Sequence, residues 1–474
     1  MMKRGYFMNY VNGRAENVKI AYVGGGSRGW AWQFMSDLVT CGDMSGDVNL
    51  YDIDYQAAQD NEIIGNKFNS VEGANCVWNY HACKTPAEAM SDADFVVISI
   101  LPGTFDEMES DVHTPEKYGI YQSVGDTSGP GGIVRAMRTI PMFEEIAENV
   151  KKYCPNAWVI NYTNPMTLCV KTLYRVFPEI KAFGCCHEVF GTQRVLRTAL
   201  EEICGIKVED RAEMEVNPIS VNHFTWLTKA YYKNMDLFPV YEKFAEKYAD
   251  TGYTKNLKDN WFNDNFSCSQ RVKLDLFKRY GYIAAAGDRH LAEFCPGKWY
   301  LKDEETAHEW GFGLTPVSWR KQNLQEKLEK SRKLISGELP ITPVPSGEEG
   351  VTQMRAILGL RNPLVTNVNI PNRGQIPNLP LGAVVETNAV FRSGTVTPVM
   401  AGEVPKSIHP MISRICTEQE LVSEAIAKRD VELVFNAFVN DPLVTCSYDD
   451  ARKLFKEMVM NTKHYLTDYD LSSL

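Results

Sequence analysis

The stretch Asn17-Val-Lys-Ile-Ala-Tyr-Val-Gly-Gly-Gly-Ser-Arg-Gly-Trp30 decides the fold of this chain. It begins with an apolar run typical of a buried strand, and glycines follow at once. Gly24, Gly26 and Gly29 satisfy the pattern G-x-G-x-x-G, and an amphipathic helix pattern comes next. Glycine at these positions lets the backbone turn tightly and approach a pyrophosphate at the helix N-terminus. The stretch predicts a dinucleotide-binding turn with Ser27 among its contacts, and a plain turn is the alternative.

The acidic residue after the next strand indicates which cofactor to expect. A second apolar run, Val48 to Tyr51, ends beside Asp52. A carboxylate at this position hydrogen-bonds the adenosine ribose hydroxyls and disfavours a 2′-phosphate. The ordered set of strand, glycines, helix, strand and acid is more specific than the glycines alone. We therefore expect NAD rather than NADP, bound in part by Asp52.

The alternation of strand and helix patterns continues to about residue 205. The run Ala93 to Leu101 is nearly all apolar, as buried parallel strands are. We predict an α/β protein in which residues 17–205 form a Rossmann-like doubly wound parallel sheet. Paired strands and amphipathic helices follow, which predicts a mixed α+β domain over residues 206–474. This order of domains is typical of lactate and malate dehydrogenases.

The composition of the chain narrows its classes of function. A formal net charge of -10 argues against nucleic acid or an anionic membrane as the main partner. No run approaches the roughly 20 apolar residues of a transmembrane helix. The first residues, MMKRGYFMNY, lack the apolar core of an export signal. The 12 cysteines have no framework spacing, so we expect reduced thiols in a cytoplasmic protein.

Reactive side chains follow a later strand, at the edge where open α/β sheets bind ligands. Phe183-Gly-Cys-Cys-His-Glu-Val189 places Cys186, His187 and Glu188 in consecutive positions after a short apolar run. His223 follows downstream. A thiolate and an imidazole suit a divalent transition metal, so Cys186 and His223 are candidate metal ligands. A small core cysteine and a structural histidine are the alternative, and spacing alone leaves both open.

Three further stretches carry groups that can contact a ligand. The glycine-rich loop 125–132 contains Asp126 and precedes a long helix, and the strand pattern before Pro165 ends with Asn164. The third stretch surrounds a run of small residues and contains Tyr282, Asp288, Arg289 and His290. A turn, a mobile connection or an exposed polar loop is the alternative in each case.

Taken together, these stretches resemble glycoside hydrolase family 4. The matching runs are GGGSRGW, LYDID, GPGGIVRAMRTIP, NYTNP, GCCHEV, VNHFTW and AGDRHLAEF. A late run, IPNLPLGAVVETNAVFRSGTVTPV, is similar to the C-terminal segment of that family. Members of the family are NAD- and manganese-dependent glycosidases, which do not use the usual pair of carboxylates. The resemblance implies NAD and Mn²⁺ as cofactors and Cys186 with His223 as metal ligands.

The resemblance also implies a redox-assisted elimination. NAD would take a hydride from C3 of the sugar, and the resulting ketone would acidify the proton on C2. A base would remove that proton, the glycosidic oxygen would leave with help from an acid, water would add, and the hydride would return. A metal with only two protein ligands keeps positions open for sugar oxygens and acts as a Lewis acid.

The roles of individual residues follow from the same resemblance. Asn164 would hydrogen-bond the sugar and Asp126 would lie near it. The base of the family is a tyrosine in some subgroups and an aspartate in others; we favour Asp288, with Tyr282 as the alternative. The acid of one phosphate-specific subgroup is an aspartate directly after the metal cysteine, whereas here His187 occupies that position and Glu188 follows it.

The string Cys-His-Glu-Val from Cys186 resembles the α-galacturonidase subgroup. The Cys-Asp and Cys-Asn forms belong to enzymes of 6-phosphosugars. A uronic acid carries a carboxylate that arginine binds bidentately, and Arg289 and Arg373 are candidates for this contact. We expect an α-galacturonidase acting on short galacturonides as a homodimer or homotetramer. The alternatives are the same mechanism on an α-galactoside, α-glucoside or α-glucuronide, a 2-hydroxy-acid dehydrogenase, and a non-catalytic NAD sensor.

Overall fold

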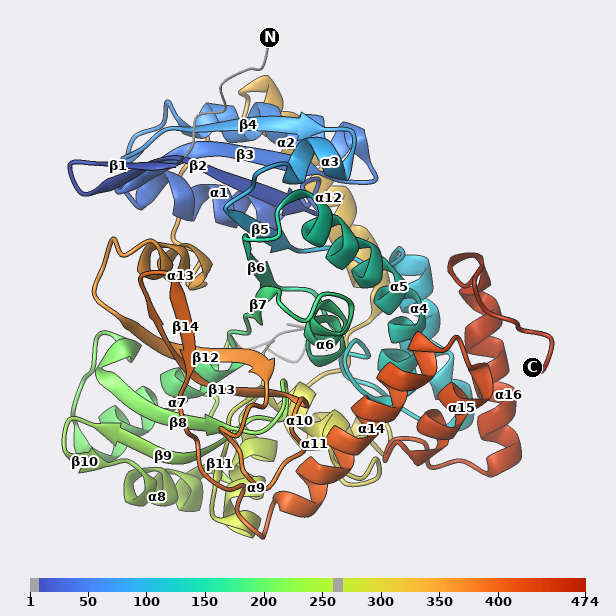
Figure 1. Ribbon diagram of the computed structural model, residues 1–474. Helices are drawn as coiled ribbons and strands as arrows, with labels where there is room; N and C mark the ends of the chain where they lie inside the picture. The colour runs from blue at the N-terminus through green and yellow to red at the C-terminus, as the bar shows by residue number, and fades with distance from the viewer. Residues whose placement is uncertain (1–7, 259–266) are drawn as a thin grey trace.

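A ten-stranded sheet forms the centre of the computed structural model, which describes residues 8–258 and 267–474 (Figure 1). The strand order is β14-β13-β12-β7-β6-β5-β2-β3-β4, and β1 pairs with β2. The strands are β1 (Asn9–Val11), β2 (Arg14–Val23), β3 (Met44–Tyr51), β4 (Trp78–Cys83), β5 (Phe95–Ile98), β6 (Trp158–Asn161), β7 (Lys181–Gly184), β12 (Leu364–Pro371), β13 (Val384–Arg392) and β14 (Thr395–Pro398).

Strands β2 to β7 are parallel and carry helices on both faces. Side chains alternate along β2, so that Ile20 and Tyr22 join one apolar core while Ala21 and Val23 join another. These helices are α1 (Trp30–Thr40), α2 (Tyr55–Phe68), α3 (Pro86–Met90), α4 (Phe105–His113), α5 (Gly129–Tyr153), α6 (Met166–Val176) and α7 (Glu188–Cys204). The predicted Rossmann-like α/β fold is confirmed.

A smaller four-stranded sheet lies in the second half of the chain. Its strands are β8 (Met214–Ile219), β9 (Trp226–Tyr232), β10 (Met235–Asp236) and β11 (Ile283–Ala284). The helices around it are α8 (Phe238–Tyr248), α9 (Arg271–Tyr280), α10 (Asp288–Phe294) and α11 (Glu304–Glu309). Strands β8 and β9 pair antiparallel, and the turn that joins them carries His223.

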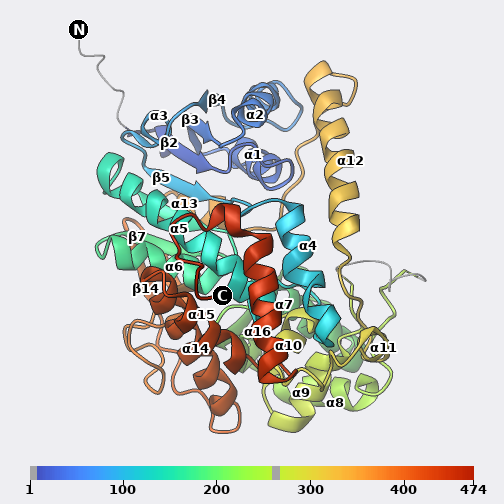
Figure 2. The same ribbon diagram turned by 90° about the vertical axis from the view of Figure 1, so that its right-hand side faces the viewer.

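The remaining helices follow in the second half of the sequence and pack against elements of both halves. They are α12 (Val317–Ser336), α13 (Gly350–Ile357), α14 (His409–Ala427), α15 (Val431–Asn440) and α16 (Tyr448–Asn461). Figure 2 shows α12 running alongside α2 and toward α4, both of which it contacts. Short 3₁₀ segments are η1 (Pro115–Tyr118), η2 (Arg211–Glu213) and η4 (Lys463–Tyr465). None of the helices in the described ranges is long and apolar enough to cross a membrane.

Strands β12 to β14 extend the parallel sheet, although a long stretch of chain separates β7 from β12. Asn369 of β12 pairs antiparallel with Gly184 of β7, and β13 and β14 add outward from there. The two halves that we predicted as separate domains therefore share one sheet. Where one domain ends and the next begins stays a prediction.

Helix α5 begins earlier than the sequence pattern suggested. We expected a glycine-rich loop to residue 132, but the helix starts at Gly129 with Pro130 in its first turn, where its fixed φ suits a helix. A Cβ on Gly131 would lie 2.7 Å from the carbonyl oxygen of Asp111, and one on Gly132 would lie 2.5 Å from Thr127. These glycines allow close packing of the helix start against the loop that carries Asp126.

Candidate active site

Asp126, His223 and His290 form a cluster of metal-binding groups. One ligand atom from each residue lies within 4.8 Å of the other two. Asp126 comes from the loop before α5, His223 from the turn between β8 and β9, and His290 from α10. One carboxylate and two imidazoles form a donor set that suits a divalent transition metal.

The Thr127 hydroxyl fixes the orientation of His223. Thr127 Oγ1 donates to Asp126 Oδ1 at 2.7 Å and lies 2.9 Å from His223 Nδ1. Because its proton goes to Asp126, the hydroxyl accepts from Nδ1–H of the imidazole, which leaves the lone pair of Nε2 for a metal. His223 also has a left-handed backbone with φ of 66°, an uncommon conformation that clusters at functional sites.

His290 stacks on His223 and has an unsatisfied nitrogen. The ring centroids are 3.7 Å apart at an interplanar angle of 25°. His290 Nε2 lies 3.9 Å from Glu188 Oε1, whereas Nδ1 is buried with no hydrogen-bond partner among the described residues. A buried polar atom without a partner is unusual in a folded protein and fits a site that receives a ligand.

The protonation states in the cluster suit metal binding. Burial alone would raise the pKa of Asp126, but His223, His290 and Arg135 lower it to about 2. Burial lowers the pKa of His223 to about 3, with a further contribution from His290, and burial also lowers the pKa of His290. At neutral pH the cluster therefore has an ionised carboxylate beside two neutral imidazoles.

Cys186 lies outside this cluster but beside the residue that precedes His223. It directly follows β7, is 9% exposed, and has a pKa raised well above its usual range by burial and by Glu386. The Asn222 amide lies next to its thiol and favours the thiolate. A metal would favour that thiolate more strongly. The role of Cys186 as a metal ligand stays a prediction.

His187 faces the cofactor side of the site. Its side chain is 48% exposed, its Nδ1 lies 3.0 Å from Glu348 Oε1, and its ring stacks on Trp30 at 6.4 Å. The hydrogen bond to Glu348 raises the pKa of His187, and burial opposes the increase. Trp30 begins α1, so His187 lies between the glycine turn and Glu188 of the site.

The two candidate bases are both placed beside α9. Asp288 is fully buried, and its oxygens accept hydrogen bonds from the backbone N–H groups of Val272 and Lys273, each at 3.2 Å. Burial raises its pKa to about 6. Tyr282 precedes β11 and packs against the largest apolar core. No hydrogen bond within residues 8–258 and 267–474 joins either side chain to the cluster, so both assignments stay predictions.

The glycine turn has the geometry of a dinucleotide site. Gly26 N donates to Asp52 Oδ2 at 2.9 Å, and Ser27 N donates to the carbonyl oxygen of Gly24 at 3.0 Å. Gly24 has φ of +92°, and a Cβ there would lie 2.0 Å from the carbonyl oxygen of Ser99. A Cβ on Gly29 would meet, among the described residues, just the side chain of Lys327 on α12, with Nζ at 3.3 Å and Cε at 3.9 Å. The turn thus leaves space for a phosphate, and the ammonium group of Lys327 lies next to that space.

The predicted substrate contacts lie near Asp126. Asn164 Nδ2 donates to Asp126 Oδ2 at 3.2 Å, while its buried Oδ1 has no partner in the described chain. Arg289 is buried, donates through Nη2 to the carbonyl oxygen of Ser123, and accepts the Ser123 hydroxyl at its own carbonyl oxygen at 2.6 Å. Burial lowers the pKa of Arg289 to about 10, against the opposing effect of Glu293. Arg289 therefore braces the loop that carries Asp126.

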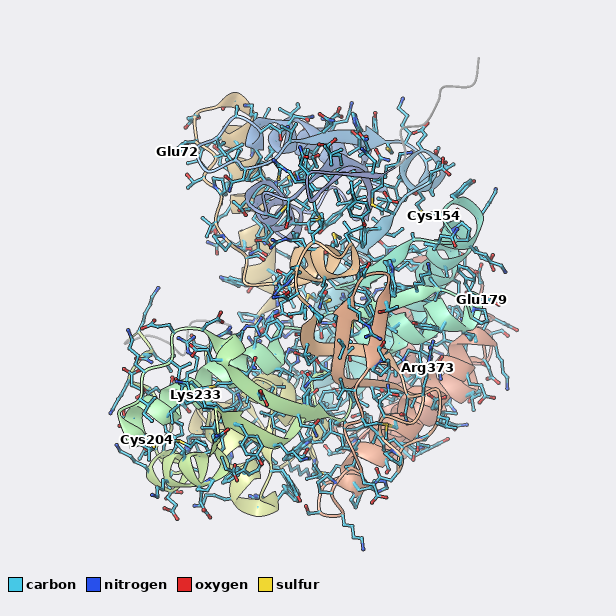
Figure 3. The ribbon with its side chains drawn as sticks, turned by 60° about the vertical axis from the view of Figure 1, so that its left-hand side comes forward. Glu72, Cys154, Glu179, Cys204, Lys233 and Arg373 are labelled. Carbon is cyan, nitrogen blue, oxygen red and sulfur yellow. The ribbon has the colours of Figure 1, made fainter. Side chains whose placement is uncertain are left out.

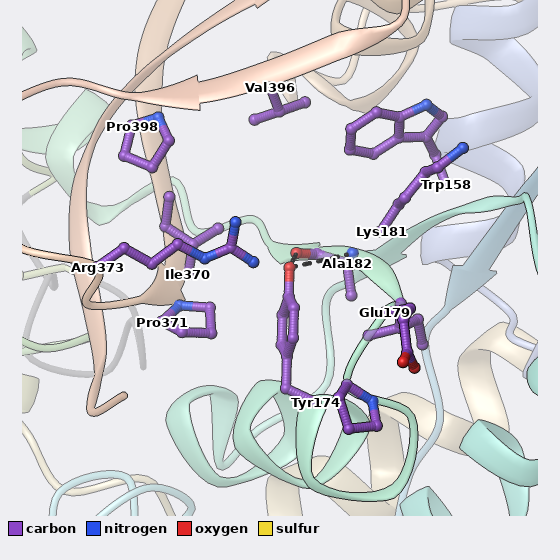
Figure 4. Close-up of a pocket in the computed structure, with 12 residues that line it drawn as sticks. Trp158, Tyr174, Glu179, Lys181, Ala182, Ile370, Pro371, Arg373, Val396 and Pro398 are labelled. Carbon is purple, nitrogen blue, oxygen red and sulfur yellow. Dashed lines mark hydrogen bonds between the residues drawn. The ribbon is translucent and has the colours of Figure 1, made fainter. Parts of the chain in front are cut away.

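Arg373 lies far along the sheet from these residues. Figures 3 and 4 place it near Glu179, at a pocket of about 230 Å³. Trp158 and Lys181, which line this pocket, begin β6 and β7, whereas Cys186 follows the other end of β7. The structure brings Arg289 to the site and leaves Arg373 at the opposite edge of the sheet.

Sequence reasoning missed several residues of the site. Thr127, Arg135 and Glu293 were not singled out, although all three are buried beside the loop of Asp126. Glu293 Oε1 accepts from the N–H groups of Val124 and Gly125 at 2.7 and 2.9 Å. The position of Thr127 directly after Asp126 was a local signal that could have identified it. The contacts of Glu293 join distant parts of the chain and leave no such signal.

Known proteins resemble this chain over nearly its whole length. Residues 19–202 match the sequence pattern of family 4 glycosyl hydrolases, and residues 220–444 match that of the C-terminal domain of the same family. An α-galacturonidase of Thermoanaerobacterium saccharolyticum is 58% identical, over 98% of this chain and 100% of the relative. The crystal structure of lplD from Bacillus subtilis is 50% identical, covers 94% of this chain and 100% of its own, and has a TM-score of 0.89.

A more distant solved structure has the same fold. It is a 6-phospho-α-glucosidase from gut microorganisms in complex with NAD and Mn²⁺. It is 19% identical, covers 96% of this chain and 100% of its own, and has a TM-score of 0.77.

Proposed function

Because this chain belongs to family 4 of the glycosyl hydrolases, we propose that it is an NAD- and Mn²⁺-dependent α-galacturonidase. The observation that carries the proposal is the cluster of Asp126, His223 and His290, which gathers metal-binding atoms beside the strand end that carries Cys186. The 58% identity to a relative named α-galacturonidase supports the substrate class. The proposed substrates are short α-linked galacturonides.

The residues of the cluster fit a divalent metal. His223 offers Nε2, because Thr127 occupies its Nδ1, and His290 offers a buried nitrogen without a partner. Asp126 and the thiolate of Cys186 are the further ligands that we propose. When bound, Mn²⁺ would stabilise negative charge on sugar oxygens as a Lewis acid, and NAD would accept and return a hydride.

The side chains around the cluster orient the sugar and move its protons. We propose that Asn164 hydrogen-bonds its hydroxyls close to Asp126 and that Arg289 binds its carboxylate from beside the same loop. Asp288 is the proposed base that takes the C2 proton, with Tyr282 as the alternative. His187 is the proposed acid that protonates the leaving oxygen, since its half-exposed imidazole stacks on Trp30 at the start of α1.

Two conservative variants distinguish the candidate bases. Asp288→Asn and Tyr282→Phe each remove one proton acceptor while keeping nearly the same shape. The variant that abolishes deuterium incorporation at C2 of the sugar in D₂O, with NAD and Mn²⁺ present, identifies the base. If both variants exchange the C2 proton at the wild-type rate, neither residue is the base.

A direct assay tests the proposed activity. The enzyme should release galacturonic acid from a digalacturonide in the presence of NAD and Mn²⁺, with no net accumulation of NADH. An α-galactoside, an α-glucoside and an α-glucuronide serve as matched substrates, and preference for any of them would refute the substrate assignment. NADH that accumulates in step with product would indicate a 2-hydroxy-acid dehydrogenase. Chelation should abolish turnover, and added Mn²⁺ should restore it.

We also propose that the protein works as a homodimer or homotetramer in the cytoplasm. Large apolar side chains are exposed on or near strands β12 to β14, where Val365 is 58%, Leu381 is 78% and Met400 is 66% exposed. Apolar surface of this kind is typical of a contact between subunits. Light scattering on the purified protein measures the assembly directly, and a monomer at micromolar concentration would refute it.

A further inference from the structure

Glu386 of β13 is a fully buried carboxyl group with no role in the steps above. It is 0% exposed. Its Oε2 accepts from Thr225 Oγ1 at 2.6 Å, and its Oε1 accepts from Asn367 Nδ2 at 2.6 Å. Burying a carboxyl group costs free energy unless its hydrogen bonds are satisfied, so these two contacts explain how Glu386 is tolerated here.

The contact with Asn367 leads to the strand end that carries Cys186. Asn367 lies on β12 and donates through the same Nδ2 to the carbonyl oxygen of Cys186, at 3.3 Å. The two strands are joined directly, since Asn369 pairs with Gly184 of β7. Glu386 therefore holds the Asn367 amide in the orientation that binds the backbone of Cys186.

The contact with Thr225 leads to the turn that carries His223. Glu386 N donates to the carbonyl oxygen of Ser220 at 2.8 Å, and the Thr225 hydroxyl lies 3.1 Å from the carbonyl oxygen of Val221. Ser220 and His223 have φ of 130° and 66°, values that non-glycine residues rarely adopt. Such a conformation persists only where its surroundings hold it in place. Glu386 contacts both ends of this turn.

The same network reaches the third ligand-bearing segment. The carbonyl oxygen of Thr225 accepts from Ala285 N at 2.7 Å, in the stretch that leads into α10 and His290. One residue in the C-terminal half of the chain is thus connected to the segments that carry Cys186, His223 and His290.

We propose that Glu386 is a positioning residue that holds the Cys186 strand end and the His223 turn at the separation required for divalent metal binding. This inference rests on the proposed metal-dependent function. Groups that orient metal ligands without touching the metal are worth about 10- to 100-fold in metal affinity.

Removing the side chain should weaken metal binding. Glu386→Ala should lower the affinity of the full-length protein for Mn²⁺ about 10- to 100-fold, measured by isothermal titration and by the electron paramagnetic resonance signal of free Mn²⁺. Excess Mn²⁺ should restore kcat, and the KM for digalacturonide should then equal that of the wild type. A general loss of folding would not be corrected by added metal in this way.

A conservative variant and a matched control separate positioning from packing. Glu386→Gln should bind Mn²⁺ nearly as well as wild type, since its amide oxygen still accepts from Asn367 and its amide nitrogen can donate to the Thr225 hydroxyl. Asn388→Ala, two residues along the same strand face, removes only the bond from Asn388 Nδ2 to the carbonyl oxygen of Val216 at 2.7 Å. That control should leave the affinity for Mn²⁺ unchanged.

Three results would overturn the role of Glu386. Wild-type affinity in folded Glu386→Ala would refute it, and so would an equal loss in Asn388→Ala. If Glu386→Ala does not fold, Thr225→Val decides the question, because it removes only the hydroxyl, and unchanged affinity would refute the role of Glu386. Failure of the wild type to hydrolyse galacturonides while it binds Mn²⁺ would refute the substrate assignment alone.

Discussion

A single hydroxyl selects the tautomer of the proposed metal histidine. Thr127 Oγ1 lies between Asp126 Oδ1 and His223 Nδ1, so it couples the carboxylate to the imidazole. Thr127→Val keeps the shape and removes the hydroxyl, so Nδ1 loses its acceptor and the ring is no longer held. We expect the affinity for Mn²⁺ to fall about 10- to 100-fold, measured by isothermal titration.

Thr167→Val is the matched control for this change. Thr167 is also buried, at 3% exposed, and its hydroxyl has no hydrogen-bond partner among the described residues. It should bind Mn²⁺ as the wild type does. Equal affinities in the two variants would exclude a role of Thr127 in orienting His223.

Glu293 should make stability depend on pH. Burial raises its pKa to about 8 in the folded protein, from 4.5. The folded state therefore favours the protonated acid, and this contribution is complete below pH 4.5 and is lost as the pH rises through about 8. Glu293→Gln mimics the neutral acid and keeps an oxygen for the N–H groups of Val124 and Gly125.

The variant should therefore gain stability over the wild type as the pH rises. We expect the difference in the free energy of unfolding to grow by on the order of 3 kcal/mol between about pH 5 and about pH 8. Urea unfolding of both proteins at several pH values measures it. A difference that stays constant across this range would mean that Glu293 is ionised in the folded protein.

At the residue scale, sequence succeeds where a motif encodes backbone geometry. Gly24, Gly26 and Asp52 could be expected to lie together because all three belong to a single βαβ unit, and Gly26 N does donate to Asp52 Oδ2. Thr127 and Glu386 could not be found in this way. Thr127 contacts a histidine 96 residues away, and Glu386 contacts a threonine 161 residues away. No local pattern records such pairings.

At the scale of elements, a buried ion pair joins α4 to α5. Arg138 donates to both oxygens of Asp111 and, through Nε, to the carbonyl oxygen of Pro102 at 2.9 Å. The side chains are 0% and 2% exposed. Arg138→Met leaves Asp111 buried without its charge partner, so we expect the free energy of unfolding to fall by about 3–5 kcal/mol. Chemical denaturation measures this loss.

An exposed ion pair provides the control at the same scale. Arg452 lies 2.7 Å from Glu432, with side chains 32% and 47% exposed. Because water solvates both charges, Arg452→Met should cost less than about 1 kcal/mol. Similar losses for the two methionine variants would contradict the role that we assign to burial.

The sequence pattern predicted that helices α1 and α5 exist, but it predicted their first and last residues less accurately. Helix α1 was expected directly after Gly29 and spans Trp30–Thr40. The start of α5 was missed because a glycine-rich helix start that packs closely against a loop has the same amino-acid composition as a glycine-rich mobile loop. Only the tertiary contacts of Gly131 and Gly132 distinguish the two.

At the scale of the whole molecule, one sheet connects the glycine turn, the strand end that carries Cys186, and Glu386. The turn follows β2, Cys186 follows β7, and Glu386 lies on β13, all within one set of hydrogen-bonded strands. The sequence predicted the parallel part of this sheet from its alternation of strands and helices. It could not predict that β12 pairs with β7, because an antiparallel contact between distant segments leaves no periodic pattern.

We expect this shared sheet to make the two halves unfold together. Scanning calorimetry of the full chain should show one transition, and NAD should raise the Tm of the whole protein, since it binds only the folded form. Two separate transitions, of which only one responds to NAD, would indicate that the halves are energetically independent.

The pairing of β12 with β7 also limits how the gene can be divided. A fragment that ends near residue 205 would contain every predicted NAD contact, yet it would leave β7 as an open edge. Unpaired backbone groups along such an edge are a template for intermolecular strand pairing. The nucleotide-binding half is therefore a poor module for expression or transplantation by itself, and chimaeras with relatives should exchange β12 to β14 together with it.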